Sequence, residues 1–354
     1  MSKRVLIAMS GGIDSSVAAM LLLEQGYELV GCTFRTFDSI KESCLAKEKG
    51  CCSVDSIMEA KHLAEKLGFE HHILDYRETF RQSVIANFID EYKHGRTPNP
   101  CVLCNSHIKW GKLLEAADEY NCDFIATGHY ARIAELNGRF CLRRAADSRK
   151  DQTYFLWMLT DENLRRTIFP LGDLTKQQVR EIALQHGFEQ LSKKSESQEI
   201  CFVPNNDYRS FLASEGVQTH AGDFINSDGK VLGRHEGGTN YTIGQRKGLG
   251  IALGTPAFVT KIDAERNLVT LGAHDDLLTK TVRMRRFFFC GDSSQSVMAQ
   301  IRYRSQPTEA YLSYSLTSNS EAVLTFSEPV WAVTPGQSAV IYQGELLVGG
   351  GIIE

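Results

Sequence analysis

Val5–Ser16, with the sequence VLIAMSGGIDSS, decides how the first part of this chain folds. It opens with an apolar run as far as Met9, which is typical of a strand buried on both faces. Gly11 and Gly12 follow, and glycine lets the backbone turn sharply and approach a ligand closely. From Ile13 the apolar residues recur with helical spacing. The stretch therefore predicts a strand, a glycine turn and the start of a helix.

This turn has the form of an anion-binding site, because the N–H groups and the dipole of a helix N-terminus both favour negative charge. The lysine of the common triphosphate loop, GxxxxGK[ST], is missing. The pattern SGGxDS instead resembles the pyrophosphate-binding loop of ATP pyrophosphatases. We expect Asp14 to bind Mg²⁺ together with phosphates. The alternative is an ordinary strand-to-helix turn, but such turns rarely have Ser, Gly, Gly, Asp, Ser and Ser in this order.

The length of 354 residues predicts two or three domains. No apolar run approaches the ~20 residues that cross a bilayer. The sequence MSKR leads directly into the first strand without a signal peptide, so we expect a cytoplasmic protein that does not enter a membrane. Its 10 cysteines are then expected to serve metal binding or chemistry rather than structural disulfides.

The net charge of −4 argues against a nucleic-acid partner, but the distribution of charge argues for one. Basic residues concentrate in three segments, 93–112, 139–150 and 280–304, whereas 305–354 contains neither Lys nor Arg. Such local clusters in an acidic protein are typical of a face that binds a polyanion. The alternative is solvated charge on unrelated faces.

The first two hundred residues alternate between strand and helix patterns. The expected strands are 5–9, 27–34, 70–74 and 124–127, and the expected helices include 54–67, 80–92, 106–120 and 176–185. This alternation predicts an α/β domain at 1–203 with a doubly wound parallel sheet. Ligands of such sheets lie beyond the carboxyl ends of the strands, so the loops at Ser10–Ser16, after Phe34 and at Gly128-His129 should converge.

After residue 204 short strands and glycine turns replace this alternation. Hairpins at 221–233, with Asp228-Gly229 at the turn, and at 255–271 predict a small β domain at 204–275. Alternating segments in 276–354 predict a closed antiparallel barrel, with a turn at 335–337. In this barrel Arg302 and Arg304 are expected on one face of a strand and Tyr303 on the other.

Residues 95–105, GRTPNPCVLCN, contain a CxxC pair, Cys101 and Cys104, after a stiff Pro-Asn-Pro. This spacing brings two sulfurs to one point, for a metal, a cluster or thiol exchange. Near a helix N-terminus and beside His107 and Lys109, both thiols should have lowered pKa values. A structural pair without chemistry is the alternative reading.

Cys201 follows the small polar run KSESQEI and adds a third thiol to this set. The remaining cysteines are expected to be structural or incidental: Cys44, Cys51 and Cys52 in a polar connection, and Cys32, Cys122, Cys141 and Cys290 as small buried hydrophobes. Lys150 to Trp157, KDQTYFLW, predicts a helix with aromatic core residues and with Lys150 and Gln152 exposed at its start for phosphate or base contact.

Ten motifs now stand in one order: SGGIDSS, GCCS, TPNPCVLCN, ATGHYAR, KDQTYFLW, FPLG, KSESQEICFV, YTIGQRKGLGI, IRYRS, and PGQSAV through GGGII. In this order they resemble the tRNA-specific 2-thiouridylase family over nearly the whole chain. The resemblance implies that sulfur replaces O2 of the wobble uridine, position 34, in tRNAs for Lys, Glu and Gln. ATP would be converted to AMP and pyrophosphate, with Mg²⁺ bound beside it.

The resemblance also assigns roles to residues. Cys104 matches the nucleophile, and Cys201 matches the cysteine that carries a persulfide. Positions matching the ATP site are Ala8, Met9, Ser10, Gly11, Gly12, Ile13, Asp14, Ser15, Phe34 and Gly128. Positions matching tRNA contacts are Asn99, Pro100, Cys101, His129, Lys150, Asp151, Gln152, Arg302, Tyr303 and Gln337. The family further implies a cysteine desulfurase or a sulfur-relay protein as donor, and we expect a monomer.

Cys101 departs from the family pattern, since many relatives have Asp there. Three thiols, Cys101, Cys104 and Cys201, resemble the sets that hold a [4Fe–4S] cluster in other tRNA thiolases, with the fourth iron open to sulfide. Our hypothesis at this point is that the protein binds such a cluster.

Two other classes of protein remain as alternatives. One is a synthetase that uses the same loop to adenylate a small molecule and needs no cysteine set. The other is a noncatalytic tRNA- or metal-binding protein, which would release no pyrophosphate in response to tRNA.

Overall fold

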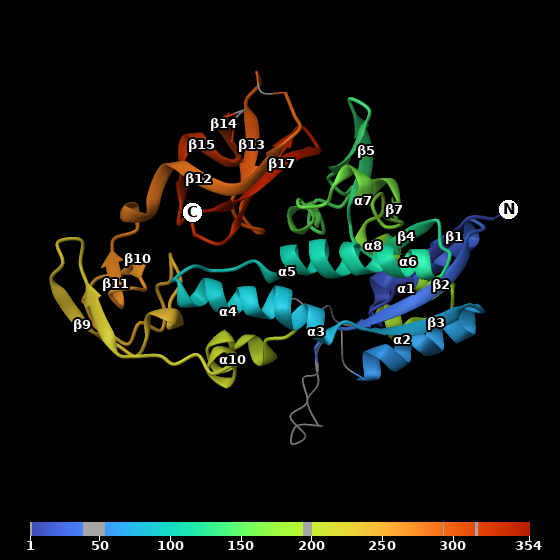
Figure 1. The fold of residues 1–354 in the computed structure, drawn as a ribbon, viewed down its shortest axis with the longest axis horizontal. Helices are drawn as coiled ribbons and strands as arrows, with labels where there is room; N and C mark the ends of the chain where they lie inside the picture. Colours follow the sequence, from blue (N-terminus) through green and yellow to red (C-terminus); the bar gives the residue numbers. More distant parts are fainter. Residues whose placement is uncertain (1, 38–53, 194–199, 293, 316–317) are drawn as a thin grey trace. The chain divides into compact units, whose positions relative to one another are not determined.

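The computed structural model describes residues 2–37, 54–193, 200–292, 294–315 and 318–354 (Figure 1). The chain forms two compact units. The first consists of Met1–Val84, Cys101–Asn206 and Glu345–Leu347, and the second of Ile85–Pro100, Asp207–Gly344 and Val348–Glu354. The units do not follow chain order, because a short segment that precedes the CxxC pair belongs with the C-terminal half.

The first unit is built on a parallel sheet with the strand order β3-β2-β1-β4-β7. These strands are β1 (Arg4–Ala8), β2 (Glu28–Arg35), β3 (Glu70–Asp75), β4 (Phe124–Thr127) and β7 (Thr167–Ile168). Val5, Leu6 and Ile7 of β1 have no exposed surface, as expected of a strand that is covered on both faces. The predicted parallel sheet is confirmed.

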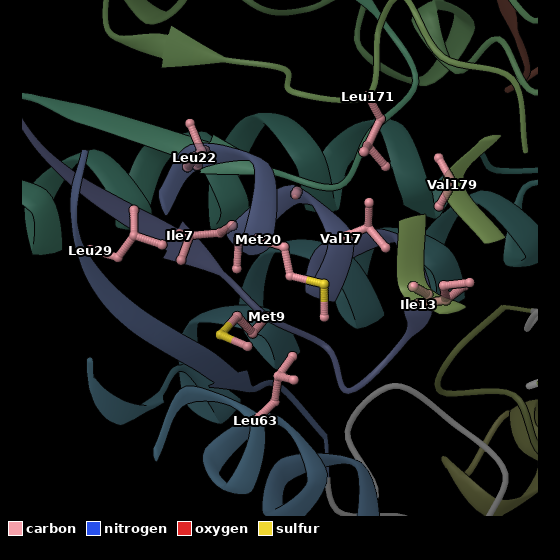
Figure 2. Packing of buried hydrophobic residues seen from close by; sticks show 14 of the residues in the cluster. Ile7, Met9, Ile13, Val17, Met20, Leu22, Leu29, Leu63, Leu171 and Val179 are labelled. Carbon is pink, nitrogen blue, oxygen red and sulfur yellow. The ribbon is translucent and has the colours of Figure 1, made fainter. Parts of the chain in front are cut away.

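Helices on this sheet enclose the core of the first unit. They include α1 (Ile13–Glu24), α2 (Val54–Leu67), α6 (Leu113–Glu119) and α8 (Lys176–Gln185). Figure 2 shows side chains of β1, α1, α2 and α8 gathered in one apolar cluster, among them Ile7, Met20, Leu63 and Val179. The bounds of α2, α8 and β4 are those that the sequence predicts. Gly68 follows α2 with φ of +85°, a conformation that glycine adopts at low cost.

Two helical stretches contain π-helical turns that no sequence pattern indicated. One runs through α3 (Arg77–Phe80), η1 (Arg81–Ile85) and α4 (Ala86–Lys93), and the other through α5 (Pro100–Leu103), η2 (Cys104–Lys112) and α6. The second begins six residues before its predicted start at Ser106, so both cysteines of the CxxC pair are helical. Wide turns of this kind recur at functional sites.

Smaller elements complete the first unit. They are the hairpin β5 (Arg132–Leu136) and β6 (Arg139–Arg143), η3 (Thr153–Phe155), α7 (Asp161–Arg165), α9 (Glu189–Ser192) and η4 (Pro204–Asn206). The predicted helix from Lys150 to Trp157 is wrong, because only a short 3₁₀ turn forms there. The Asp151 side chain accepts hydrogen bonds from Ala145 N and Thr153 Oγ1, and such local bonds compete with a helix. The aromatic residues Tyr154 and Trp157 are buried as predicted.

The second unit contains a four-stranded sheet with the order β10-β11-β8-β9. Its strands are β8 (Gly222–Ile225), β9 (Val231–His235), β10 (Phe258–Asp263) and β11 (Leu268–Gly272), accompanied by α10 (Tyr208–Ser214), η5 (Gly238–Asn240) and η6 (Asp275–Leu277). Both predicted hairpins are confirmed. Gly229 has φ of +81° at the tip of the first.

The same unit contains the predicted antiparallel barrel. Its strands are β12 (Leu278–Phe289), β13 (Val297–Gln300), β14 (Thr308–Ser315), β15 (Ser318–Trp331), β16 (Ser338–Gln343) and β17 (Leu346–Ile353). Pairing of β12 with both β15 and β17 closes it. Each of these six strands therefore pairs with two others of the six, and none of them is an edge strand of the barrel.

The predicted strand through Arg302–Arg304 is wrong, because β13 ends at Gln300. The Gln300 side chain donates to the carbonyls of Arg302 (3.1 Å) and Tyr303 (2.7 Å), which removes acceptors that a strand would offer to a neighbour. Ser305 N then donates to Arg302 O and closes a turn. In the described part of the chain, no helix is both long and apolar enough to cross a membrane.

Candidate active site

The loop after β1 is shaped to receive a phosphate. Gly11 has φ of +67°, and a methyl group on it would lie 2.3 Å from the Ser56 carbonyl oxygen, so only glycine fits. Gly12 is the N-cap of α1, and no side chain of the described residues caps this end. Ser15 and Ser16 each donate to the Gly12 carbonyl and fix the loop. The N-terminus of α1 is therefore available to an anion.

The loop after β4 meets this phosphate loop. A methyl group on Gly128 would lie 2.6 Å from Ser15 N, so the backbone of Gly128 touches the first turn of α1. The predicted convergence of these two loops is confirmed. Phe34, near the end of β2, packs its ring edge-on against Tyr76 at 5.3 Å between centroids.

Asp14 lies at the centre of a charged cluster in the first turn of α1. Lys176 Nζ donates to its Oδ1 (2.7 Å) and Oδ2 (2.9 Å), and Tyr130 Oη donates to Oδ1 (2.7 Å). The Lys176 side chain is 9 % exposed and that of Asp14 is 31 % exposed. A fixed, partly open carboxylate beside an anion site fits a magnesium ion that also binds phosphate. No sequence pattern indicates that Lys176 and Tyr130 contact Asp14, because both lie more than a hundred residues from it.

The three cysteines of interest differ in exposure: Cys101 and Cys201 are exposed and Cys104 is half-buried. Protein atoms crowd the sulfur of Cys101 despite its exposed surface, and this desolvation raises the pKa of its thiol, while the charge on Lys109 opposes the rise. The predicted lowered pKa is therefore wrong for Cys101. Loss of water around the thiolate is the larger of the two effects, and the charge on Lys109 offsets only part of it.

The described conformation does not fit a cluster. Across the described ranges, no three His, Cys, Asp or Glu side chains come together as a metal-binding group, and Cys101, Cys104 and Cys201 all lie in those ranges. We therefore derive no chemical step through iron.

His129 is held at both ring nitrogens. Its Nδ1 lies 2.8 Å from Thr127 Oγ1 and its Nε2 lies 3.3 Å from Lys109 Nζ. An ammonium can only donate, so Nε2 accepts and the ring proton is on Nδ1. Burial, and then the charge on Lys109, hold the pKa of His129 well below its usual value. The ring is therefore neutral and positions Lys109, which belongs to the same π-helical segment as Cys104.

Of the three residues at 150–152 that are expected to contact tRNA, two have side chains that are hydrogen-bonded to other residues of the first unit. Asp151 is buried and accepts from Arg144 Nη1 at 3.0 Å in addition to its local bonds. Gln152 Oε1 accepts from Tyr130 N at 2.9 Å. Lys150 is half-buried in a turn closed by its N–H on the Asp147 carbonyl.

Further expected tRNA contacts belong to the second unit. Asn99 is half-buried and Pro100 is buried. Arg302 donates to the Ala332 carbonyl and to Thr334 Oγ1, so its guanidinium is held against the barrel. Gln337 donates to the carbonyls of Thr97 (3.0 Å) and Pro98 (2.9 Å). The half-buried Tyr303 lies in the turn after β13.

A parallel α/β sheet with a lysine-free phosphate loop defines a pyrophosphatase-loop domain, and residues 3–205 match a family model described as tRNA methyl transferase HUP domain. Residues 209–273 match a tRNA methyl transferase PRC-barrel domain and 279–353 an aminomethyltransferase beta-barrel domain. The chain belongs to the tRNA-specific 2-thiouridylase MnmA family. It is 49% identical to the member from Amoebophilus asiaticus over 99% of this chain and 95% of that protein. It is 48% identical to the member from Cytophaga hutchinsonii, over 99% of this chain and 97% of that protein.

Proposed function

We propose that this protein is an ATP-dependent tRNA 2-thiouridylase that converts the wobble uridine, position 34, of tRNAs for Lys, Glu and Gln to 2-thiouridine. The observation that carries the proposal is the presence of an open phosphate loop and the Cys101–Cys104 pair in one compact unit. Family membership over the full chain supports the same reading. A phosphate loop alone would serve many adenylating enzymes, but a pair of thiols in the same unit favours sulfur transfer.

The first step activates the uracil ring. O2 of the uridine attacks the α-phosphorus of ATP, the bond to the β-phosphate breaks, and pyrophosphate leaves while N3 loses its proton. The N-terminus of α1 and Lys176 stabilise the phosphate charge, and Asp14 would hold Mg²⁺. Bound magnesium would supply additional positive charge to the leaving pyrophosphate. The product is an AMP ester, which makes O2 a good leaving group.

The second step transfers sulfur. The terminal sulfur of a Cys201 persulfide bonds to C2, and the bond from C2 to the AMP oxygen breaks. The Cys104 thiolate then attacks the Cys201 sulfur, and the persulfide S–S bond breaks. Its electron pair stays on the sulfur bound to C2, which becomes the thiocarbonyl as N3 regains a proton. A thiol reductant must reduce the resulting Cys104–Cys201 disulfide before the next turnover.

The family resemblance supports the choice of partners. We infer that the sulfur comes from a cysteine desulfurase or a sulfur-relay protein and that the enzyme acts as a monomer. The target base must leave the anticodon stack to be reached, and the segment with Asn99, Pro100 and Cys101 would meet it. Lys150 and the barrel turn at Tyr303 would face the tRNA backbone.

The test is thiolation of an unmodified tRNA for Glu with ATP and a desulfurase, with pyrophosphate release and 2-thiouridine measured separately. Cys104→Ser should abolish 2-thiouridine but leave tRNA-dependent pyrophosphate release. Cys290→Ser, at a half-buried cysteine of the barrel, is the matched control and should behave as the wild type. Full thiolation by Cys104→Ser would remove Cys104 from the mechanism. Pyrophosphate release that ignores tRNA, without 2-thiouridine in the wild type, would refute the proposal and favour a small-molecule synthetase.

A further inference from the structure

The barrel turn at residues 335–337 is hydrogen-bonded to Thr97 and Pro98, which we call the gripped segment. The turn and the gripped segment both belong to the second unit. Gln337 Nε2 donates to the carbonyls of Thr97 and Pro98, and Thr97 N donates to the Pro335 carbonyl at 2.8 Å. A side-chain amide has two N–H groups, and these two carbonyls use both of them. The grip therefore consists of three hydrogen bonds on two consecutive residues.

Gly336 makes the approach close enough for these bonds. It has φ of +89°, and a methyl group on it would lie 2.8 Å from the Thr97 carbonyl oxygen and 3.0 Å from Glu91 Oε2. Any larger residue would push the gripped segment away from the turn. The glycine is thus required both by its backbone angle and by the space it leaves.

A buried ion pair fixes the other end of the gripped segment. Glu91, with a side chain 7% exposed, binds Arg96 at 2.6 Å and Arg285 of β12 at 3.0 Å. Burial alone would raise the pKa of Glu91, but its bonds to Arg96 and the charges of both arginines outweigh it and hold the pKa below its usual range. The carboxylate is therefore ionised and ties the end of α4 to the barrel wall.

The gripped segment continues directly into the cysteines. Only Asn99 and Pro100 separate Pro98 from Cys101. Proline fixes its own φ and restricts the residue before it, so Pro98-Asn99-Pro100 transmits position with few degrees of freedom.

We propose that Gln337 is a positioning residue: with Gly336 it clamps Thr97 and Pro98 to the barrel and so sets where the Cys101–Cys104 helix begins. In this role its side chain acts on the protein's own backbone, which is a function separate from the tRNA contact that the resemblance implied.

The test compares Gln337→Met, which keeps the volume but removes both donors, with Gln343→Met. Gln343 makes the same kind of bond, to the Asp292 carbonyl at 2.7 Å, and is the matched control. Hydrogen exchange at the Thr97 amide in the free protein should be about tenfold faster or more in Gln337→Met and unchanged in Gln343→Met. Gly336→Ala should reproduce the faster exchange, although it removes no side chain that RNA could contact.

A kinetic measurement rests on the proposed function, whereas the exchange measurement needs neither tRNA nor ATP. For thiolation, Gln337→Met should lower kcat at saturating tRNA and leave KM for tRNA unchanged. Unchanged exchange together with a raised KM would overturn the clamp and restore a direct RNA contact. Should Gln337→Met not fold, Gln337→Asn keeps the amide but reaches one carbonyl at most, and its exchange rate should lie between those of wild type and Gly336→Ala.

Discussion

Lys176 at the start of α8 binds both carboxylate oxygens of Asp14 at the start of α1, at 2.7 Å and 2.9 Å. Two helix N-termini therefore meet at one ion pair, which holds the acidic residue of the phosphate loop in place. When no phosphate is bound, the positive charge of Lys176 neutralises the carboxylate of Asp14 in this half-buried site. The two helix dipoles alone would not neutralise it.

Lys176→Met should weaken ATP binding about tenfold or more, because it removes a positive charge from the pyrophosphate site. It should also cost about 1 kcal/mol of folding free energy, since Asp14 loses its ion pair but stays partly open to water and keeps the hydrogen bond from Tyr130. Calorimetric titration with ATP and urea unfolding measure the two effects. Lys230→Met, at an exposed lysine, is the control, and equal ATP affinity in both variants would contradict the prediction.

Gly128→Ala should abolish ATP binding while the sheet still forms. The new methyl group would lie 2.6 Å from Ser15 N and push β4 away from the first turn of α1. Gly111→Ala, whose methyl group would meet nothing closer than 3.4 Å, serves as the control. Titration of both variants with ATP checks this, and normal affinity in Gly128→Ala would show that the two loops can separate freely.

Stability should fall as the pH drops below about 6.5, through His71. Thr33 Oγ1 donates to the Met9 carbonyl, so His71 Nε2 carries a proton and donates to Thr33 at 2.9 Å. Burial, more than the nearby charges, lowers the pKa of His71 to about 4. The unfolded chain therefore binds the proton more readily, and the stabilising contribution is complete above pH 6.5 and lost progressively toward pH 4.

Urea unfolding between pH 7.5 and pH 5 measures this dependence. His71→Gln keeps a donor for Thr33 but cannot titrate, so its unfolding free energy should vary less with pH than that of the wild type. His62→Gln is the control, because the His62 side chain is 71% exposed. Identical slopes in all three proteins would rule out His71 as the source.

Cys101→Asp should keep thiolation activity, and anaerobically purified protein should be active without iron. The reason is that the described cysteines do not gather as ligands, while Cys104 and Cys201 suffice for persulfide chemistry. The visible spectrum, iron content and activity after chelation test this together. Iron near four per chain, with activity lost on chelation, would instead establish the cluster hypothesis and make Cys101 a ligand.

Local patterns predicted most of the fold. The apolar run before Gly11 and the helical spacing after it placed β1 and α1, and Asp228-Gly229 placed a hairpin turn. Such features depend on neighbours in sequence, which the sequence displays directly. Side chains that bind backbone groups produced the errors. Hydrogen bonds of the Gln300 side chain end a strand that was predicted to continue, and hydrogen bonds to the Asp151 side chain stabilise a turn where a helix was predicted. Neither effect is visible in the periodicity of apolar residues.

The contacts that sequence patterns did not predict join residues that lie far apart in the chain. Lys176 and Asp14 are 162 positions apart, and Gln337 and Thr97 are 240 apart. The motif order did identify the segments that contain Asp14 and Gln337. It could not show that Gln337 also binds the backbone of Thr97 and Pro98, because an RNA contact and a backbone contact require the same amide.

Because the two units interleave in sequence, the coding sequence cannot be divided at one point into a part for each unit. Residues 85–100 complete the C-terminal unit and residues 345–347 complete the N-terminal one, so no single cut divides the chain into self-sufficient pieces. A fragment ending at residue 206 would expose Glu91 and Arg96 without the barrel arginine and turn that hold them. Neither unit can therefore be produced whole from one continuous piece of the chain.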